Sequence, residues 1–491
     1  MTFSKLIASI IAGYTLSIAA EACTTIIVGK DASADGSIII SRNSDSHSAV
    51  NAKHLVIHQD VVHLEKTYFK SSSNDFTYEL PKISFQYIGL PYWYTNDHSM
   101  EQEGSNEFGV TISATESIYN NPKALEADPY NKKSGISEDA ITTVILQSVK
   151  TAREGVELLG NIITTQGTAE GFGVAIGDKD EVWYLETASG HLWAAAKVPD
   201  DSYFVSANQS RLQQINLADK QNYLGPPNLI SFAKEHNLFK GEDKDFSFRD
   251  AYARKVPADV TYNFLRVWTL QNMYSPNLTF SQTKDDSPAF LKPEHKISVD
   301  EVMAGLRNYY QGTKNNPYIN NNYDEPYRPI SVFRESNSHV TVVRDHLPID
   351  IANIVYIALG MNSLSIYLPF YSSISQVPTS YTLGNDHSSD DSAYWTFRKV
   401  QTLAMLNFEK YAPIVQKAYA KLAEEIEVKH QAMEKEYLAL YKNNITLARK
   451  KVQDFIDWEV NAALNTAKQL ANELMTLETI KINNQYEFPG A

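Results

Sequence analysis

Apolar and polar positions alternate in short runs along the first half of the chain, a pattern typical of β-strands. After residue 23, "TTIIV" (24–28) and "SIIIS" (37–41) are β-branched runs separated by the polar segment "GKDASADG". These runs predict two strands joined by a loop. Similar patterns recur at residues 108–115, 172–187, 192–198 and 202–208, with a polar turn at 178–180. Because short strands follow one another directly, we expect antiparallel sheets rather than parallel ones.

The middle of the chain shows helical spacing in one segment and loop composition in another. Residues 137–163 carry apolar residues near helical spacing behind Ser137, with acidic residues in the first turn. This pattern predicts one helix that packs on a sheet. Residues 215–330 are rich in Asn, Asp, Pro and Tyr. That composition favours long surface loops with short helices.

The C-terminal part of the chain is predicted to be helical from residue 394 onward. Between Val415 and Leu440 apolar residues recur at steps of three, four or seven. We expect a break near residues 442–444 and further helix to about residue 475. An apolar stripe of this kind is typical of a face that packs within the chain or between copies of it in a homo-oligomer.

The first 22 residues have the pattern of a signal peptide. Lys5 is followed by the almost wholly apolar run Leu6–Ala20, and Ala20-Glu21-Ala22 has the small-x-small form of a cleavage site. The apolar run is shorter than the roughly 20 residues needed to span a bilayer. We therefore expect cleavage directly before Cys23 and export to the periplasm or medium, with no stable membrane insertion afterwards.

Charge and cysteine content narrow the classes of function. The chain has 44 Lys and Arg against 58 Asp and Glu, a formal charge of −14, and lacks a basic stripe that would bind nucleic acid. Cys23 is the only cysteine among 491 residues, so no internal disulfide can form. No Cys/His group has zinc-ligand spacing. We expect neither a metal nor a cofactor.

Cys23 would become the first residue of the cleaved chain, which gives its thiol a base. An ordinary thiol has a pKa of ~8.5 and is mostly protonated at neutral pH. The new α-amino group, with a pKa of ~7.7 to 8.0, could accept the thiol proton directly or through water. If the first two strands form a hairpin, "SRNSD" brings Arg42 and Asp45 beside Cys23.

Other interpretations of these residues remain open at this point. Arg42 and Asp45 would also suit a solvated surface ion pair, and Cys23 would suit a small buried apolar side chain. A lipid anchor on Cys23 is a third interpretation. Lipoprotein signals favour a large aliphatic residue three positions before the cysteine, whereas Ala20 and Glu21 stand here before Ala22.

Several blocks of sequence, in order, resemble the C69 dipeptidases, a family of N-terminal-nucleophile (Ntn) hydrolases. The opening block is "CTTIIVGKDASADGSIIISRNSDSH" (23–47), and the second is "NEFGVTISATES" (106–117). Later blocks are "EVWYLETASGHLWAAAKVPDDSYFVSANQSRL" (181–212), "RESNSHVTVVRDHLP" (334–348) and "SIYLPFYSSISQVPTSY" (365–381). The resemblance covers about residues 23–410 and is weakest in the C-terminal helices.

The resemblance implies an α+β fold with a four-layer αββα sandwich of two antiparallel sheets. It implies a catalytic domain over residues 23–410, followed by a helical segment over 411–491. Its strands and helices agree with those that the hydrophobic pattern predicts.

The resemblance also implies roles for individual residues. Cys23 would be the nucleophile, with Arg42 beside the thiol and Asp45 orienting the amine. Asn208 would donate its side-chain amide to the oxyanion, and Glu116 would donate its backbone N–H. Glu186, with His191 and Trp193, is interpreted as structural, because alternating strand residues commonly pack or face solvent.

The substrates that the resemblance implies are dipeptides with a free N-terminus. Their charged ends need a carboxylate and a cation, and Arg344 is one candidate for the cation. Two other functions stay open: a penicillin V or bile-salt acylase on the same scaffold, and an exported lipoprotein or binding module in which Cys23 is lipidated.

Overall fold

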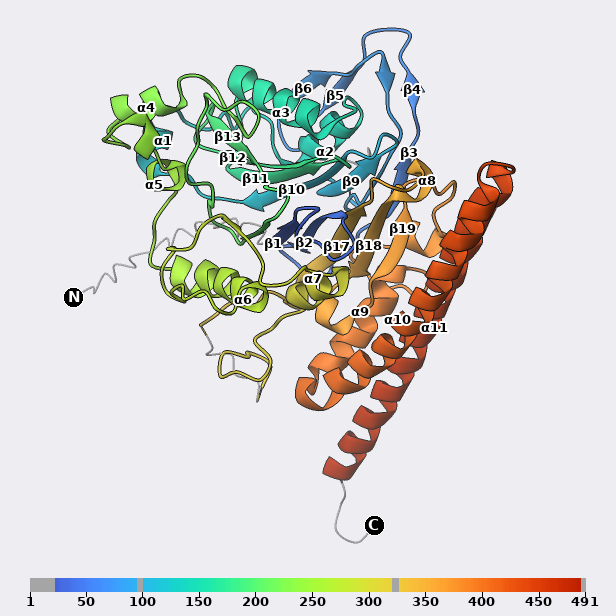
Figure 1. Cartoon of the computed structure of the whole chain (residues 1–491). Coiled ribbons are helices and arrows are strands. Elements are labelled where there is room, and N and C mark those ends of the chain that lie inside the picture. The colour runs from blue at the N-terminus through green and yellow to red at the C-terminus, as the bar shows by residue number, and fades with distance from the viewer. Residues whose placement is uncertain (1–22, 95–99, 320–325, 487–491) are drawn as a thin grey trace, which may run out of the picture.

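The computed structural model describes residues 23–94, 100–319 and 326–486, and two large antiparallel sheets form its centre (Figure 1). The first sheet has the order β16 (Phe290–Leu291), β14 (Tyr203–Ser206), β1 (Thr24–Val28), β2 (Ile38–Asp45), β17 (Glu335–Val343), β18 (Asn353–Leu359) and β19 (Leu368–Tyr371). The second has the order β15 (Tyr223–Leu224), β13 (Trp193–Lys197), β12 (Val182–Thr187), β11 (Phe172–Gly177), β10 (Thr111–Ser117), β9 (Glu103–Asn106), β8 (Tyr87–Gly89) and β3 (Val56–His58). Two small ribbons pair β4 (Val61–Val62) with β7 (Ile83–Ser84) and β5 (Tyr68–Lys70) with β6 (Thr77–Glu79).

The inner faces of the two sheets meet over β2. Strands β10 and β11 of the second sheet contact β2 of the first. Ile27 and Ile40 share one hydrophobic cluster with Ala175 and Tyr184 from the facing sheet. Every residue of β1 and β2 is buried, which fits the continuous β-branched runs of these strands. The predicted strands and their antiparallel pairing are thus present, and two facing sheets are consistent with the expected sandwich.

Helices cover the outer faces of both sheets. They are α1 (Pro122–Ala127), α2 (Glu138–Leu146), α3 (Ala152–Gln166), α4 (Leu229–Glu235), α5 (Phe248–Tyr252), α6 (Leu265–Tyr274), α7 (Val299–Leu306), α8 (Ile349–Ala352), α9 (Ala393–Met405), α10 (Phe408–Leu440) and α11 (Ile445–Gln485). Short 3₁₀ helices are η1 (Asp243–Asp245), η3 (Asn362–Leu364) and η4 (Thr379–Thr382), and η2 (Val260–Phe264) is a single π-helical segment. Helices α2 and α3 contact the second sheet, whereas α6 and α7 contact the first.

The single helix expected over residues 137–163 is wrong, because two helices occupy this segment. Helix α2 ends at Leu146, and α3 begins after Thr151, whose side chain accepts a hydrogen bond from the Glu154 backbone N–H. Ser137 stands at the start of α2 but makes no side-chain capping bond there. The two helices still pack on a sheet, as the pattern predicted.

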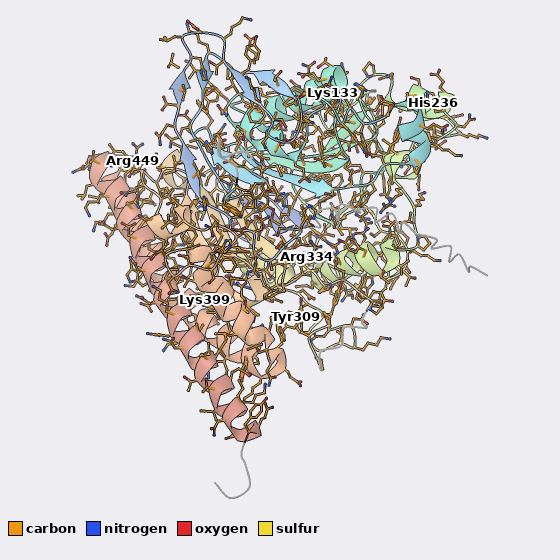
Figure 2. The ribbon with its side chains drawn as sticks, turned by 180° about the vertical axis from the view of Figure 1, so that it is seen from behind. Lys133, His236, Tyr309, Arg334, Lys399 and Arg449 are labelled. Carbon is orange, nitrogen blue, oxygen red and sulfur yellow. The ribbon has the colours of Figure 1, made fainter. Side chains whose placement is uncertain are left out.

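The C-terminal helices pack against the edge of the first sheet. Helix α9 contacts β18 and α11 contacts β19, while α10 and α11 run antiparallel along one side of the molecule (Figure 1). The stripe from Val415 to Tyr437 is buried in the same hydrophobic cluster as Ile357 and Leu368 of the sheet. Figure 2 shows Arg449 near the tip of this hairpin, where its side chain binds Asp350 of α8 at 2.7 Å. The helices are therefore an integral layer, although the division at residue 410 stays a prediction.

Among the residues that the structure describes, none of the helices has both the length and the apolar character that a membrane span requires.

A half-buried carboxylate helps to hold α10 on the sheet. Glu434 of α10 accepts hydrogen bonds from Arg344 at 2.6 and 3.1 Å and from the Tyr371 hydroxyl at 2.7 Å. Burial acts to raise the pKa of Glu434, but hydrogen bonds from His430 and Arg344 outweigh it and lower this pKa to about 2. The ionised carboxylate therefore stabilises the folded state above its ordinary pKa of 4.5, and this contribution is lost as the pH falls towards 2.

We expect Glu434→Gln to destabilise the protein by roughly 3 kcal/mol at pH 7, because Arg344 and His430 lose the carboxylate that they share. Denaturant unfolding of both proteins at pH 7 and pH 3 measures this difference, which should shrink at the lower pH. Glu436→Gln is the matched control, since the Glu436–Lys451 pair at 2.8 Å is exposed and screened by solvent, and its loss should change the stability much less. An equal effect of both variants, or a difference independent of pH, would contradict the expectation.

Candidate active site

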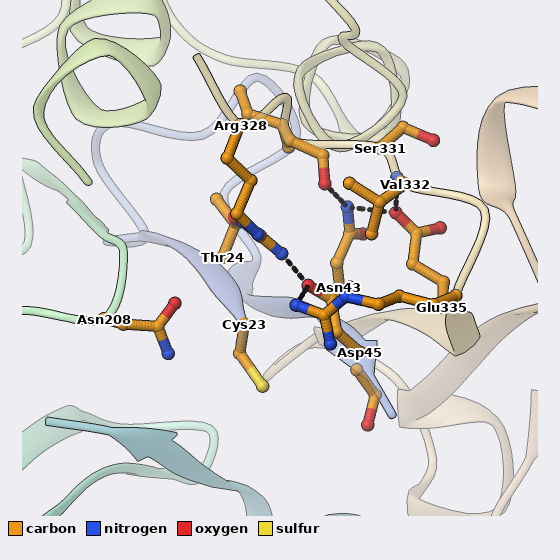
Figure 3. A network of polar contacts seen from close by, with 12 residues as sticks. Cys23, Thr24, Asn43, Asp45, Asn208, Arg328, Ser331, Val332 and Glu335 are labelled. Carbon is orange, nitrogen blue, oxygen red and sulfur yellow. Dashed lines mark hydrogen bonds and ion pairs between the residues drawn. The ribbon is translucent and has the colours of Figure 1, made fainter. Parts of the chain in front are cut away.

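Strand β1 places Cys23 between two strands that both carry polar residues. Thr24 pairs with Asn43 of β2, and Thr25 pairs with Ser206 of β14. Extending this register by two residues brings Asn208 opposite Cys23 on one side, while the end of β2 lies on the other. The Cys23 side chain is fully buried and lies between Asn208 and Asp45 in the close-up view (Figure 3).

Arg42 lies on β2 opposite Thr25 and extends to the facing sheet. Its Nη2 donates to Gln102 Oε1 at 3.0 Å and lies 3.5 Å from Glu103 Oε2. Burial acts to lower the pKa of Arg42, but the charges of Cys23 and Glu103 outweigh it and raise this pKa. Arg42 is therefore a permanent cation close enough to the thiol to stabilise a thiolate.

Glu103, on the facing sheet, is the carboxylate that pairs with Arg42. Its Oε1 accepts a hydrogen bond from Asn337 Nδ2 at 2.6 Å. Burial acts to raise the pKa of Glu103, but Lys53, His339 and Arg42 together lower it. For His339 burial dominates and lowers the pKa to about 4, so this imidazole is neutral at physiological pH. The buried carboxylate of Glu103 is thus held in its charged form by the cations Lys53 and Arg42.

Asp45, at the end of β2, forms ion pairs with two arginines. Its carboxylate contacts Arg328 closely and Arg334 at 3.9 Å (Figure 3). Burial, followed by the charge of Arg334, lowers the pKa of Arg328 to about 9, while Cys23 acts in the opposite direction. Apart from these ion pairs, the described residues donate no hydrogen bond to the Asp45 oxygens. The carboxylate therefore has free acceptor positions at the start of β1.

Arg266 of α6 joins the start of β1 to Asn208. Its Nη1 donates to the Cys23 carbonyl at 2.6 Å and to Thr24 Oγ1 at 2.9 Å. Its Nη2 donates to Asn208 Oδ1 at 2.9 Å. Because the guanidinium occupies Oδ1, the amide nitrogen of Asn208 is turned away from it, and Nδ2 donates to the Ser117 carbonyl at 3.2 Å. An oriented amide donor thus stands beside the cysteine.

The contact with Ser117 places the end of β10 beside Asn208. Glu116 precedes Ser117 in this strand and pairs with Gly173 of β11. The pairing shifts between Ala114 and Glu116, so a bulge interrupts the regular ladder at this point. Bulges redirect backbone groups, and this one lies next to the candidate oxyanion donor.

A second layer of polar residues supports the end of β2. Asn43 donates to Glu335 Oε1 at 3.1 Å, and the Asn362 backbone N–H donates to Glu335 Oε2 at 2.8 Å. Burial raises the pKa of Glu335 to about 8. On the opposite flank, Glu186 accepts a 2.6 Å hydrogen bond from the Arg211 backbone N–H, which fixes the loop after Asn208. These contacts fit the structural role expected for Glu186.

Arg344 is not part of this arrangement, so its candidacy as a cation for substrate is wrong. It follows the last residue of β17, Val343, whereas Glu335 at the first end of that strand pairs with Asp45. A strand of nine residues separates the two ends by roughly 30 Å. Arg344 instead binds Glu434 of α10.

Arg266, Arg328, Glu103 and Glu335 belong to the site but did not emerge from the sequence. Glu335 stands in the block "RESNSH" that carried part of the resemblance. The other three stand in segments with no motif around them, and Arg266 and Arg328 come from the region expected to form surface loops. They are far from Cys23 along the chain, and a local sequence pattern does not show which distant residues come into contact.

The chain is similar to known peptidases over most of its length. The family model described as Peptidase family C69 matches residues 22–421. A probable dipeptidase from Salmonella dublin is 51% identical over 351 residues, which cover 71% of this chain and 81% of the relative. A probable dipeptidase from Latilactobacillus sakei is 34% identical over 81% of this chain and 83% of the relative. A dipeptidase from Bifidobacterium longum is 31% identical over 78% of this chain and 77% of the relative.

The matched span contains Cys23, Arg42, Asp45 and Asn208, as well as both large sheets. A buried cysteine beside a paired arginine and an oriented amide is suited to peptide-bond hydrolysis. The matches and the geometry of the site indicate the same chemistry. The chain is a peptide-bond hydrolase that belongs to peptidase family C69.

Proposed function

We propose that this protein is an exported dipeptidase of the Ntn-hydrolase fold, activated when residues 1–22 are removed. The segment 1–22 and its cleavage site lie outside the described residues. The observation that carries the proposal is the position of Cys23. It lies just before a central strand, with the cation Arg42 near it and the side-chain amide of Asn208 beside it. The helix–sheet–sheet–helix arrangement and the dipeptidase names of the relatives support it.

In the proposed reaction, the Cys23 α-amine accepts the thiol proton and the thiolate attacks the peptide carbonyl carbon. Arg42 favours the thiolate, and Asp45 accepts a hydrogen bond from the amine. The Asn208 amide and the Glu116 backbone N–H stabilise the tetrahedral oxyanion. The C–N bond then breaks as the amine returns the proton to the leaving amino acid, which leaves a thioester on Cys23.

Water completes the cycle by attacking the thioester. The same α-amine accepts a proton from this water and returns it to the sulfur, so the second amino acid leaves as a carboxylic acid and the thiol is restored. One group thus serves both half-reactions, and the proposal needs no metal or cofactor.

Substrate class is tested with the purified mature protein on a panel of free dipeptides and of acyl amides such as penicillin V and conjugated bile salts. We expect kcat/KM to be highest for dipeptides. Hydrolysis confined to the acyl amides would reject the dipeptidase assignment while keeping the same nucleophile.

Cys23→Ala should be exported and cleaved normally but inactive, because the alanine retains the amine and lacks the sulfur. Intact mass of wild type and variant should correspond to residues 23–491, and cell fractionation should place both outside the cytoplasm. A lipid adduct on Cys23 would remove the free amine and support the lipoprotein alternative. Full activity of Cys23→Ala would exclude the thiol as nucleophile.

Asn208→Ala should lower kcat roughly 100- to 1,000-fold with little change in KM, because the lost donor acts on the oxyanion rather than on the ground state. Steady-state kinetics on a dipeptide separates the two constants. Asn216→Ala, in the loop that follows, is the matched control and should retain the wild-type kcat. A large increase in KM at unchanged kcat would assign Asn208 to substrate binding instead.

A further inference from the structure

A pocket of about 360 Å³ lies where the end of α7, η3 and α10 come together, and the catalytic group around Cys23 does not line it. Figure 2 labels one of its lining residues, Tyr309, whose ring packs against Phe408 of α10. We call this cavity the Arg307 pocket. Its polar lining includes Arg307 and Tyr309 after α7, Ser363 and Ser365 in and after η3, and Gln416 and Tyr419 in α10.

Arg307 is the only charged side chain among the described residues that line the pocket. Its Nε donates to the Asn362 carbonyl at 3.2 Å, and its Nη2 donates to the Ser365 carbonyl at 3.5 Å. Within the described parts of the chain, Nη1 has no hydrogen-bond acceptor. The one carboxylate that acts on the pKa of Arg307 is Asp300, which forms no ion pair with it. The positive charge of the pocket is therefore not neutralised by a carboxylate in contact.

An aromatic ring holds the guanidinium of Arg307 in place. The guanidinium lies 4.6 Å from the centre of the Tyr367 ring. The Tyr367 hydroxyl shares a 2.7 Å hydrogen bond with the Ser338 hydroxyl and accepts one of 3.1 Å from Asn362 Nδ2. Burial lowers the pKa of Arg307, while Tyr367 acts in the opposite direction, and a guanidinium stays protonated at neutral pH. A fixed cation thus lines the pocket.

Three buried hydroxyl groups line the same pocket without a partner. Ser363 and Ser365 are each 4% exposed, and Tyr419 is 3% exposed. The hydroxyl oxygens of all three form no hydrogen bond with any residue that the structure describes. A buried hydroxyl without a partner costs free energy, and such groups in a native protein commonly indicate a bound ion, ligand or water.

The backbone acceptors beside these hydroxyls are already used. The Ser365 carbonyl accepts from Arg307, and the Ser363 carbonyl accepts a 3.2 Å hydrogen bond from Gln416 Nε2. The same amide nitrogen of Gln416 reaches the Tyr309 hydroxyl at 3.5 Å, which links α10 to the turn after α7. What remains in the pocket is one cation and three hydroxyls that can donate. This set suits a ligand that is rich in acceptors.

We propose that the Arg307 pocket binds a small oxyanion, a phosphate or a carboxylate, with the guanidinium of Arg307 as its cation and the hydroxyls of Ser363, Ser365 and Tyr419 as further donors. Both kinds of anion have several oxygens that accept hydrogen bonds from an arginine. The chain has a formal charge of −14, so its surface as a whole repels anions, and binding requires a local site of this kind.

The test compares inorganic phosphate, acetate and chloride at equal ionic strength and neutral pH on the mature wild type. A ligand that binds only the folded chain raises the melting temperature by mass action. We expect phosphate or acetate to raise it in a saturable way and chloride to have no such effect, and calorimetric titration should give one site per chain. A stronger response to phosphate would identify the ligand as a phosphate, and a stronger response to acetate would identify it as a carboxylate.

Variants of the lining residues locate the ion. Arg307→Gln should weaken binding at least about 10-fold, and Ser365→Ala and Tyr419→Phe should each weaken it about 3- to 10-fold. Arg307→Lys keeps the charge and should bind more tightly than Arg307→Gln. Because the Tyr419 hydroxyl has no partner, Tyr419→Phe should not lower the melting temperature in chloride, so this variant tests the site even if Arg307→Gln fails to fold.

The matched controls are Tyr441→Phe, at the end of α10 and outside the pocket, and Arg153→Gln on α3, and both should bind the ion as the wild type does. Equal responses of the wild type to phosphate, acetate and chloride would mean that the pocket holds only water, and would overturn the inference. Unchanged binding in both Arg307→Gln and Tyr419→Phe would place the ion elsewhere and would also overturn it.

Discussion

The ion pair between Arg42 and Glu103 is the constraint on which the centre of the molecule depends. Both groups are fully buried between the two sheets, and a charge in such a place is tolerated only with a partner. Each residue comes from a different sheet, so the pair fixes how the sheets face one another. Asn337 completes the coordination of Glu103. Cys23 lies at the border of this group, is fully buried, and interacts electrostatically with Arg42, whose pKa it raises.

Much of the sheet and part of the site could be predicted from the sequence, because they depend on local pattern. The β-branched runs before and after the loop at residues 29–36 form a hairpin, and that hairpin alone brings Arg42 and Asp45 towards Cys23. The break between α2 and α3 was missed because apolar residues continue through it. The sequence "TARE" from Thr151 to Glu154 has the form of a helix start and would have located the break.

The remaining parts of the site depend on contacts between distant segments, about which a single sequence holds little information. Arg266 is 243 residues from Cys23 along the chain, in a region whose composition resembles loops. The short helices expected among long surface loops are present, but Arg266 and Leu270 of α6 are fully buried, and nothing in the composition showed that α6 lies against β1. Arg344 illustrates the opposite error, since its partner Glu434 lies 90 residues further on. An isolated arginine reveals its role only when the charge beside it is known.

Arg266 binds the chain directly after the proposed cleavage site. The guanidinium binds the carbonyl of Cys23 and the hydroxyl of Thr24, both on the C-terminal side of the proposed cut. Cutting the peptide bond before Cys23, as proposed above, would break none of these bonds. The new amine would then stand on a strand end that Arg266 holds from the C-terminal side, so the position of the base would follow from contacts that do not involve the removed segment.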